Sequence, residues 1–307
     1  MEYQRLSHNE HILKRPDTYV GSLPVETDAY WVRHESGFTH CTLSASPGLV
    51  KIFDEILVNA IDQHSLHPKK VKISVTLTDM ISVVTHGVSI PIKKHPTEKI
   101  WIPELIFGHL LTSSNYNDDE KRVTGGRNGY GAKLTNVLSS TFGIHICDGK
   151  QRYSQTWHTN MSVCDPAQIT PDTSAPYVDV HFVPDWKRFG MSGMTRDFQA
   201  LIEKRTWDAA MWCAKTNVSY QGSVLGVGSL EEYALAHLGD VPIAKMKTTE
   251  FEIVVGHSTT GGFQQCSWVN GISTTKGGTH VDKVVQTICA EIAKDKKVTA
   301  KPAQIKA

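Results

Sequence analysis

The sequence predicts an α+β fold in which helices cover a layered β-sheet, and three observations carry this prediction. Residues 48–64 place apolar side chains at three- and four-residue spacing, which is typical of a helix with one buried face. Residues 71–77 alternate apolar and polar side chains, and a short run at 81–84 follows a turn, which indicates a β-hairpin. A glycine-rich stretch at 124–131 runs into the apolar residues of 132–138, so a loop should lead into a helix there.

The remaining elements follow in chain order. Runs rich in β-branched or aromatic residues predict strands at 142–147, 152–159 and 177–183. One long periodic run predicts a helix at 196–212. The sequence pattern then changes: glycines cluster at 222–228, and a new strand pattern begins at 251–255. We therefore expect a domain boundary near Ala214, with one domain at residues 1–214 and a second at 215–307.

Composition and charge exclude several classes of protein. The chain has 307 residues, and its 32 Lys and Arg side chains nearly balance 31 Asp and Glu side chains, so bulk positive charge does not hold it on a nucleic acid. No apolar run approaches the roughly 18 residues that span a bilayer, and the first residues lack a signal peptide's apolar stretch, so we expect a soluble intracellular protein without membrane contact. The six cysteines are scattered without a CxxC pair, which predicts reduced thiols and no cysteine zinc site.

The first group of residues that could carry chemistry lies on the helix expected at 48–64. Glu55, Asn59 and Asp62 are four and three residues apart, so their side chains share one helical face beside the apolar stripe. A carboxylate there could act as a general base, an amide oxygen could bind a hard cation such as Mg²⁺, and a second carboxylate could accept hydrogen bonds from an amino group. The alternative is an ordinary solvated polar face, which spacing alone favours.

Two further groups follow. The run from Gly125 to Lys133 (GGRNGYGAK) is rich in glycine, which allows close backbone approach, so its N–H groups and Lys133 could hold phosphates. It matches neither a Walker A loop nor the dinucleotide GxGxxG pattern, and a flexible hairpin or lid is the alternative. The hydroxyl and amide side chains of residues 112–116 could bind ribose and phosphate oxygens, but such residues equally cap helices and shape turns.

These residues converge on a family. The run at 111–133 (LTSSNYNDDEKRVTGGRNGYGAK) closely resembles the ATP-lid region of eukaryotic-type (type IIA) DNA topoisomerase II. The runs at 10–22, 51–60 (KIFDEILVNA) and 268–278 (WVNGISTTKGG) resemble the same family, so the resemblance covers essentially the whole chain. It implies a GHKL (Bergerat) ATPase α/β sandwich followed by a partial transducer domain of the ribosomal protein S5-like class.

The resemblance also implies roles for individual residues, with ATP and Mg²⁺ as the cofactors. Glu55 matches the general base that polarises the water attacking the γ-phosphate, Asn59 matches the Mg²⁺ ligand, and Asp62 lies on the same nucleotide-facing surface. Tyr3 matches an N-terminal arm that reaches the partner's nucleotide in a dimer. The positions that match ribose-binding, phosphate-binding and lid residues are Ser113, Ser114, Asn115, Gly126, Arg127, Asn128, Gly129, Tyr130, Gly131, Ala132 and Lys133.

Two departures from the family pattern stand out. Where the family has an Asn-Asn-Gly-Lys-Gly type sequence whose first side chain meets the adenine, this chain has Thr85-His86-Gly87-Val88-Ser89. Thr85 offers one hydroxyl instead of a carbonyl and an amide, and Ser89 restricts the backbone if that position needs a positive φ, so we expect weaker or less base-selective nucleotide binding. The family's Gln-Thr-Lys loop does not occur in residues 214–307, and we expect a chain that stops before it.

The function implied by the resemblance is that of the ATPase region of a type II DNA topoisomerase. Two copies would bind Mg²⁺-ATP, dimerise as a gate on double-stranded DNA, and couple hydrolysis to strand passage, in the nucleus or, for a viral copy, in the nucleus or a cytoplasmic virus factory of the host. The DNA-cleaving tyrosine region is not in this sequence, so this chain alone would not cut DNA. The alternatives are another GHKL ATPase, of the mismatch-repair or chaperone kind, and a degenerate GHKL module that binds nucleotide weakly and acts mainly in dimerisation.

Overall fold

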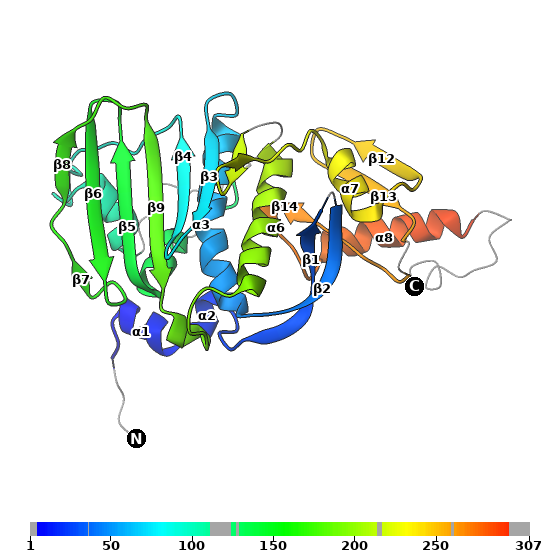
Figure 1. Ribbon diagram of the computed structural model, residues 1–307, viewed down its shortest axis with the longest axis horizontal. Coiled ribbons are helices and arrows are strands. Elements are labelled where there is room, and N and C mark those ends of the chain that lie inside the picture. The colour runs from blue at the N-terminus through cyan, green and yellow to red at the C-terminus, as the bar shows by residue number, and fades with distance from the viewer. Residues whose placement is uncertain are drawn as a thin grey trace, which may run out of the picture.

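A nine-stranded sheet forms the larger part of the molecule in the computed structural model (Figure 1). The structure describes residues 5–35, 37–110, 124–126, 129–213, 217–258 and 261–294. The strands of this sheet lie in the order β11-β10-β3-β4-β9-β5-β6-β7, with β8 also paired to β6. Their bounds are Lys72–Leu77 (β3), Ile81–His86 (β4), Ser139–Cys147 (β5), Gln151–His158 (β6), Val163–Cys164 (β7), Gln168–Pro171 (β8), Tyr177–Pro184 (β9), Val218–Tyr220 (β10) and Ser223–Val224 (β11). Only the β10–β3 pair among these is parallel.

Helices cover one face of this sheet. The longest is α3 (Pro47–Leu66), which begins with Ser46 as N-cap, its hydroxyl accepting a hydrogen bond from the amide of Leu49, and with proline at the first helical position. The other elements on this part of the chain are His8–Lys14 (α1), Asp17–Val20 (α2), Ile102–Gly108 (α4), Gly131–Val137 (α5), Trp186–Phe189 (η1) and Arg196–Cys213 (α6). The core between helices and sheet holds large apolar side chains that are almost fully buried, among them Phe53, Phe142, Tyr153, Phe182 and Phe198.

Smaller elements lie at the other end of the molecule (Figure 1). The hairpin of Glu26–His34 (β1) and Gly37–Ala45 (β2) packs on α6, and Leu230–Leu238 (α7) contacts β2, α6 and the next hairpin. The last elements are Ile243–Lys247 (β12), Glu252–Gly256 (β13), Trp268–Val269 (β14), Ile272–Ser273 (β15) and Thr279–Ile292 (α8). Within the described part of the chain, no helix combines the length and apolar character needed to cross a membrane.

The predicted α+β class is confirmed, as are the helices expected at 48–64 and 196–212 and all of the strands expected from 71 to 183. The strand expected at 251–255 is β13. The elements that the sequence did not predict include the β1–β2 hairpin, α4, α7 and α8. Strands β10 and β11, after the boundary expected near Ala214, still belong to the large sheet, while Ala214 itself lies outside the described residues, so the division at 214/215 stays a prediction.

Candidate functional site

Helix α3 brings three of the predicted site residues onto one side. Its opposite side is apolar and buried in the core, which fixes the rotation of the helix about its axis. Glu55 is half-buried, Asn59 is exposed and Asp62 is only 8% exposed. The common face predicted from their spacing is therefore present.

Asp62 holds the start of the glycine-rich segment. One of its carboxylate oxygens, Oδ1, accepts a hydrogen bond of 2.7 Å from the amide of Gly125, and the other, Oδ2, accepts one of 2.9 Å from the amide of Gly126. Burial raises the pKa of the Asp62 carboxyl above its usual value, with a smaller rise from the charge of Glu55, and the two amide hydrogen bonds offset part of this. The structure gives this carboxylate two backbone amides as partners, and the amino group suggested from the sequence stays a prediction.

Glu55 faces the first residue of α5. A Cβ atom placed on Gly131 would overlap Oε2 of Glu55, so the helix can approach the carboxylate this closely only because residue 131 is glycine. The other carboxylate oxygen, Oε1, lies 2.5 Å from Nζ of Lys51, one turn earlier on α3. Sequence reasoning did not single out Lys51, although its four-residue spacing from Glu55 is the signal for such a pair.

Helix α5 is locked against α3. The hydroxyl of Thr135 donates a hydrogen bond of 2.8 Å to the carbonyl of Ile52, and residues 132–137 are all buried. Lys133 is 2% exposed, and its Nζ donates to the carbonyl of Gly129 at 2.5 Å. Burial lowers the pKa of Lys133 to about 8. This lysine therefore braces the turn before α5 from inside the protein, and its contact with a phosphate stays a prediction.

The run at residues 85–89 lies at the end of β4. Thr85 is buried on the side of the sheet that faces α3, in register with Ile73 and Val178. Gly87 has a φ of 89°, and a Cβ atom there would overlap the carbonyl oxygen of Lys70, so glycine is required at this position. Ser89 does not adopt a positive φ. The backbone restriction expected from serine at this position is therefore absent, and Thr85 alone carries the expected difference in base recognition.

Several predicted site residues lie outside the described part of the structure. These are Tyr3, Ser113, Ser114, Asn115, Arg127 and Asn128. Their roles in binding ribose, phosphate or a partner's nucleotide stay predictions. Gly129 and Tyr130 are described and form the turn that leads into α5, with the carbonyl of Tyr130 accepting the amide of Leu134 at 2.8 Å.

A hairpin from the C-terminal part of the chain also contacts the glycine-rich segment. The side-chain amide of Asn270, between β14 and β15, donates to the carbonyl of Thr124 at 3.4 Å. The hairpin is held by Arg205, whose Nη2 donates to the carbonyl of Gly271 and whose Nε donates to Oδ1 of Asp54 on α3, both at 2.5 Å. Sequence reasoning gave no signal for this contact, because it joins residues far apart in the chain.

The chemistry of this site fits a Mg²⁺-bound nucleoside triphosphate. Hard oxygen donors of the kind that Mg²⁺ prefers are gathered on α3, and glycine amides lie opposite them. A Cβ atom on Gly126 would stand 3.2 Å from Oδ2 of Asp62 and 3.7 Å from Oδ1 of Asn59, so the backbone passes close to this face of α3. Among the described residues, no backbone amide donates to the Glu55 carboxylate, whereas two donate to Asp62, so of the two carboxylates Glu55 is the better suited to act as a general base.

Comparison with known proteins gives consistent results. The sequence family described as histidine kinase-, DNA gyrase B-, and HSP90-like ATPase matches residues 44–163. DNA topoisomerase 2 of Candida glabrata is 42% identical over 337 aligned positions, which cover 99% of this chain and 24% of that protein. The chain thus spans about a quarter of the length of such relatives.

Solved structures agree in both fold and sequence. The crystal structure of the ATPase region of Saccharomyces cerevisiae topoisomerase II superposes with a TM-score of 0.91 at 41% identity, covering 99% of this chain and 83% of that one. The ATPase and transducer domains of DNA topoisomerase II from Balamuthia mandrillaris give a TM-score of 0.88 at 37% identity, with 99% and 82% covered. This chain therefore belongs to the family of eukaryotic-type DNA topoisomerase II ATPase regions, built from a GHKL domain followed by transducer structure.

Proposed function

We propose that this chain binds Mg²⁺-ATP between α3 and the glycine-rich segment and hydrolyses it. The observation that carries the proposal is the pairing of these two elements, in which Asp62 binds the amides of Gly125 and Gly126 while Glu55 meets Gly131. The likeness to ATPase regions of topoisomerase II supports it. The alternative of a degenerate module that binds nucleotide weakly is not favoured, because Glu55 and the glycine that it faces, Gly131, are both present.

Each residue would contribute a distinct part of the reaction. Glu55 would accept a proton from the water that attacks the γ-phosphate, and Lys51 would hold the carboxylate in place. Asn59 would bind the metal through its amide oxygen, and Mg²⁺ when bound neutralises charge on the phosphate oxygens. Backbone amides of the run from Gly126 to Gly131, other than the Gly126 amide that Asp62 binds, would donate to those oxygens, and Thr85 would face the base from β4.

The proposal also covers dimerisation and DNA, for which the support comes from the longer relatives. Similarity to proteins named DNA topoisomerase 2 supports the proposal that this chain forms an ATP-dependent homodimer that acts on double-stranded DNA. In this proposal, residues 1–214 form the ATPase domain and residues 215–307 belong to the transducer. ATP would favour the closed dimer through its higher affinity for that state, and hydrolysis would reopen it, which couples the reaction to DNA strand passage. We infer a nuclear location for the cellular protein from the same relatives.

The test is the variant Glu55→Gln, which keeps the size of the side chain and removes the base. We expect steady-state ATP hydrolysis to fall by roughly 10²–10⁴-fold, the usual contribution of a general base, while ATP affinity by calorimetry changes little. Glu98→Gln, an exposed residue in a loop away from α3, is the matched control and should hydrolyse at the parental rate. Parental turnover in Glu55→Gln would reject the assigned role.

Dimer closure has its own measurement. Light scattering with and without a non-hydrolysable ATP analogue reports binding and association together, since the proposed dimer forms when nucleotide is bound. We expect a doubling of mass on addition of the analogue to Glu55→Gln as well as to the parent protein. An unchanged mass in both would contradict the proposed gate while leaving ATP binding to be judged by calorimetry.

A further inference from the structure

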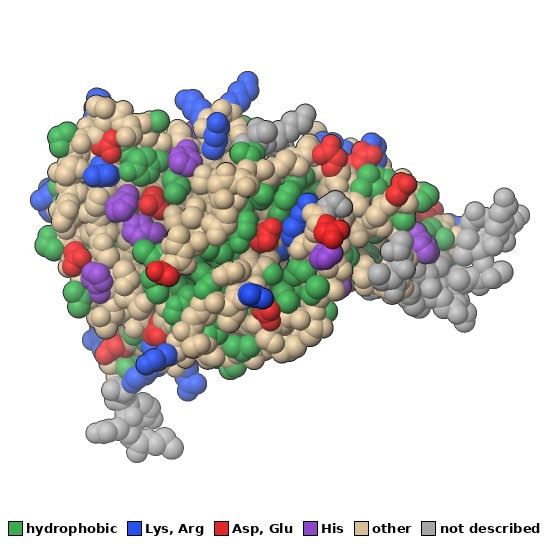
Figure 2. Space-filling model, in the orientation of Figure 1, with side chains coloured by type: hydrophobic (Ala, Val, Ile, Leu, Met, Phe, Trp, Pro, Cys, Tyr) green, Lys and Arg blue, Asp and Glu red, His purple; other side chains and the backbone are tan. Residues whose placement is uncertain are grey.

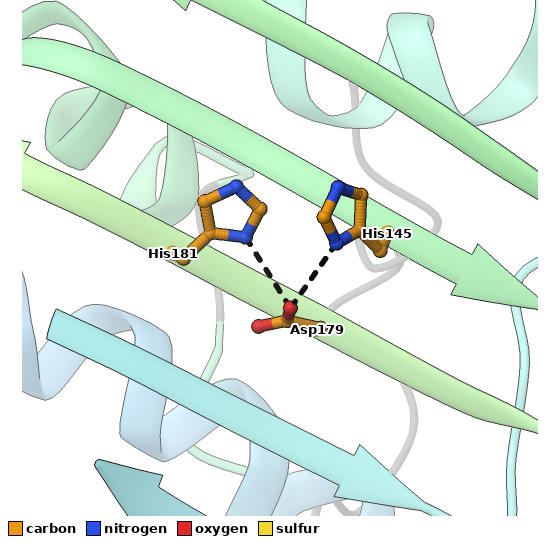
Figure 3. A group of neighbouring side chains, drawn as sticks. All are labelled: His145, Asp179 and His181. Carbon is orange, nitrogen blue, oxygen red and sulfur yellow. Dashed lines mark ion pairs between the residues drawn. The ribbon is translucent and has the colours of Figure 1, made fainter. Parts of the chain in front are cut away.

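Three metal-binding side chains meet on the open face of the large sheet. His145 lies on β5 directly opposite Asp179 on β9, and His181 lies two residues further along β9 (Figure 3). Val180, between the last two, points the other way and is buried in the core. Histidine side chains gather on this face of the molecule, over the strands, in the space-filling view (Figure 2).

The distances among the three suit one small cation. Nδ1 of His145 lies 3.5 Å from Oδ2 of Asp179, and Nδ1 of His181 lies 3.3 Å from the same oxygen. The three ligand atoms all lie within 4.8 Å of one another. In a tetrahedral zinc site with bonds of about 2.0–2.1 Å, two ligand atoms stand roughly 3.3–3.4 Å apart, so two of the three edges are already near that length.

The surroundings support the same arrangement. The hydroxyl of Ser82 on β4 donates a hydrogen bond of 2.9 Å to Oδ1 of Asp179, which orients the carboxylate and leaves Oδ2 toward the two imidazoles. A Cβ atom on Gly143 would overlap Nε2 of His181, so the ring has its place over β5 only because residue 143 is glycine. The side chains of Asp179 and His181 are 19% and 16% exposed, and that of His145 is 46% exposed, which leaves an entry path from solvent.

We propose that His145, Asp179 and His181 bind one divalent late first-row transition-metal ion, with zinc as the favoured ion and an open position for water or a further ligand. Imidazole with a carboxylate is a donor set that suits zinc, whereas Mg²⁺ prefers oxygen donors alone. This site lies on the side of the sheet opposite Thr85 and α3, so it is separate from the proposed nucleotide site and does not rest on the proposed function. A bound ion would tie β5 to β9 on the face that no described helix covers.

The test is a calorimetric titration of the metal-stripped 307-residue chain with ZnCl₂ in the presence of excess Mg²⁺. We expect one ion bound per chain through these residues, and we expect His145→Ala to weaken this binding by more than about tenfold, because it removes a direct ligand. The matched control is His158→Ala, which removes another histidine paired with a single carboxylate, Asp165, at 3.0 Å, and should leave the binding unchanged. Co²⁺ offers a second readout, since its visible absorption reports four-coordinate nitrogen and oxygen ligation.

The variants also separate ligation from folding. His145 is the most exposed of the three residues, so His145→Ala should fold, as circular dichroism will verify. Ser82→Ala should weaken zinc binding by roughly tenfold, because the Asp179 carboxylate loses the hydrogen bond that orients it. Zinc binding that is equal in the parent, His145→Ala and Ser82→Ala, or absent from the parent, would overturn the proposal. In that case the three side chains form only a hydrogen-bonded His–Asp–His group.

Discussion

Replacing Asp62 with asparagine should loosen the glycine-rich segment from α3. The carboxylate offers two oxygens, and each accepts one backbone amide, from Gly125 at 2.7 Å and from Gly126 at 2.9 Å. Asparagine has nearly the same shape but only one oxygen, so its NH₂ group must face one of the two amides. One partly buried amide then loses its acceptor on residue 62, and the remaining bond loses its charge.

The size of the effect follows from these two bonds. A hydrogen bond to a charged group contributes about 1.5–3 kcal/mol, so the loss of one of them should cost about 2 kcal/mol. That figure corresponds to a change of roughly thirtyfold in the equilibrium between the attached and released segment. If nucleotide binds only when the segment is attached, apparent ATP affinity should fall by up to the same factor.

Amide hydrogen exchange measures the release directly. In the regime where closing is faster than exchange, the rates at Gly125 and Gly126 scale with the opening equilibrium, so both should rise by roughly thirtyfold in Asp62→Asn. Gln63→Ala, an exposed neighbour on the same helix, is the control and should leave both rates unchanged. Equal exchange in Asp62→Asn and the parent protein would refute the reasoning, because it would mean that the carboxylate does not hold the segment.

Three other predictions concern the same site. Gly131→Ala should lower the rate of ATP hydrolysis at least tenfold, because the new Cβ displaces the Glu55 carboxylate. Gly193→Ala, with open space around residue 193, should hydrolyse ATP at the parental rate. Equal rates in the two variants would count against the close approach of residue 131 to Glu55. Burial lowers the pKa of Lys133 to about 8 from an unfolded value near 10.4, so the native state binds fewer protons than the unfolded state between these two pH values. The free energy of unfolding should therefore rise with pH across this range by up to about 3 kcal/mol in the parent protein, but not in Lys133→Met. Urea titrations that gave the same pH dependence for both proteins would contradict this. Because Thr85 stands where the family pattern implies an adenine-binding asparagine, ATP and GTP affinities should differ by less than about tenfold, and strong exclusive ATP preference would oppose this.

Much of the fold was predictable because local pattern and tertiary burial agree. The alternation at β3 and β4 and the helical period of α3 each reflect one face turned to the same core. The β1–β2 hairpin was missed because its strands lie outside the large sheet and most of their residues are exposed or half-exposed, so apolar and polar residues do not alternate clearly. Helix α8 did carry a signal in Val281, Val284, Val285 and Ile288, at helical spacing, which the lysine-rich sequence around it obscured.

The site was predictable in its residues but not in its partners. Spacing alone placed Glu55, Asn59 and Asp62 on one face, since three residues on one helix need no tertiary information. That Asp62 binds backbone amides, that Gly131 makes room for Glu55 and that Lys133 turns inward all depend on how a loop 60 or more residues away meets α3. The His–Asp–His group had no signal for the same reason, because strand register brings its members together.

The central claim is that α3 and the glycine-rich segment enclose a Mg²⁺-bound triphosphate, and a crystal structure with Mg²⁺ and a non-hydrolysable ATP analogue tests it most directly. The account predicts the metal bound to the Asn59 amide oxygen, the γ-phosphate against the backbone between Gly126 and Gly131, and the Glu55 carboxylate beside the attacking water. Nucleotide bound elsewhere on the chain, with these residues in contact only with solvent, would contradict it.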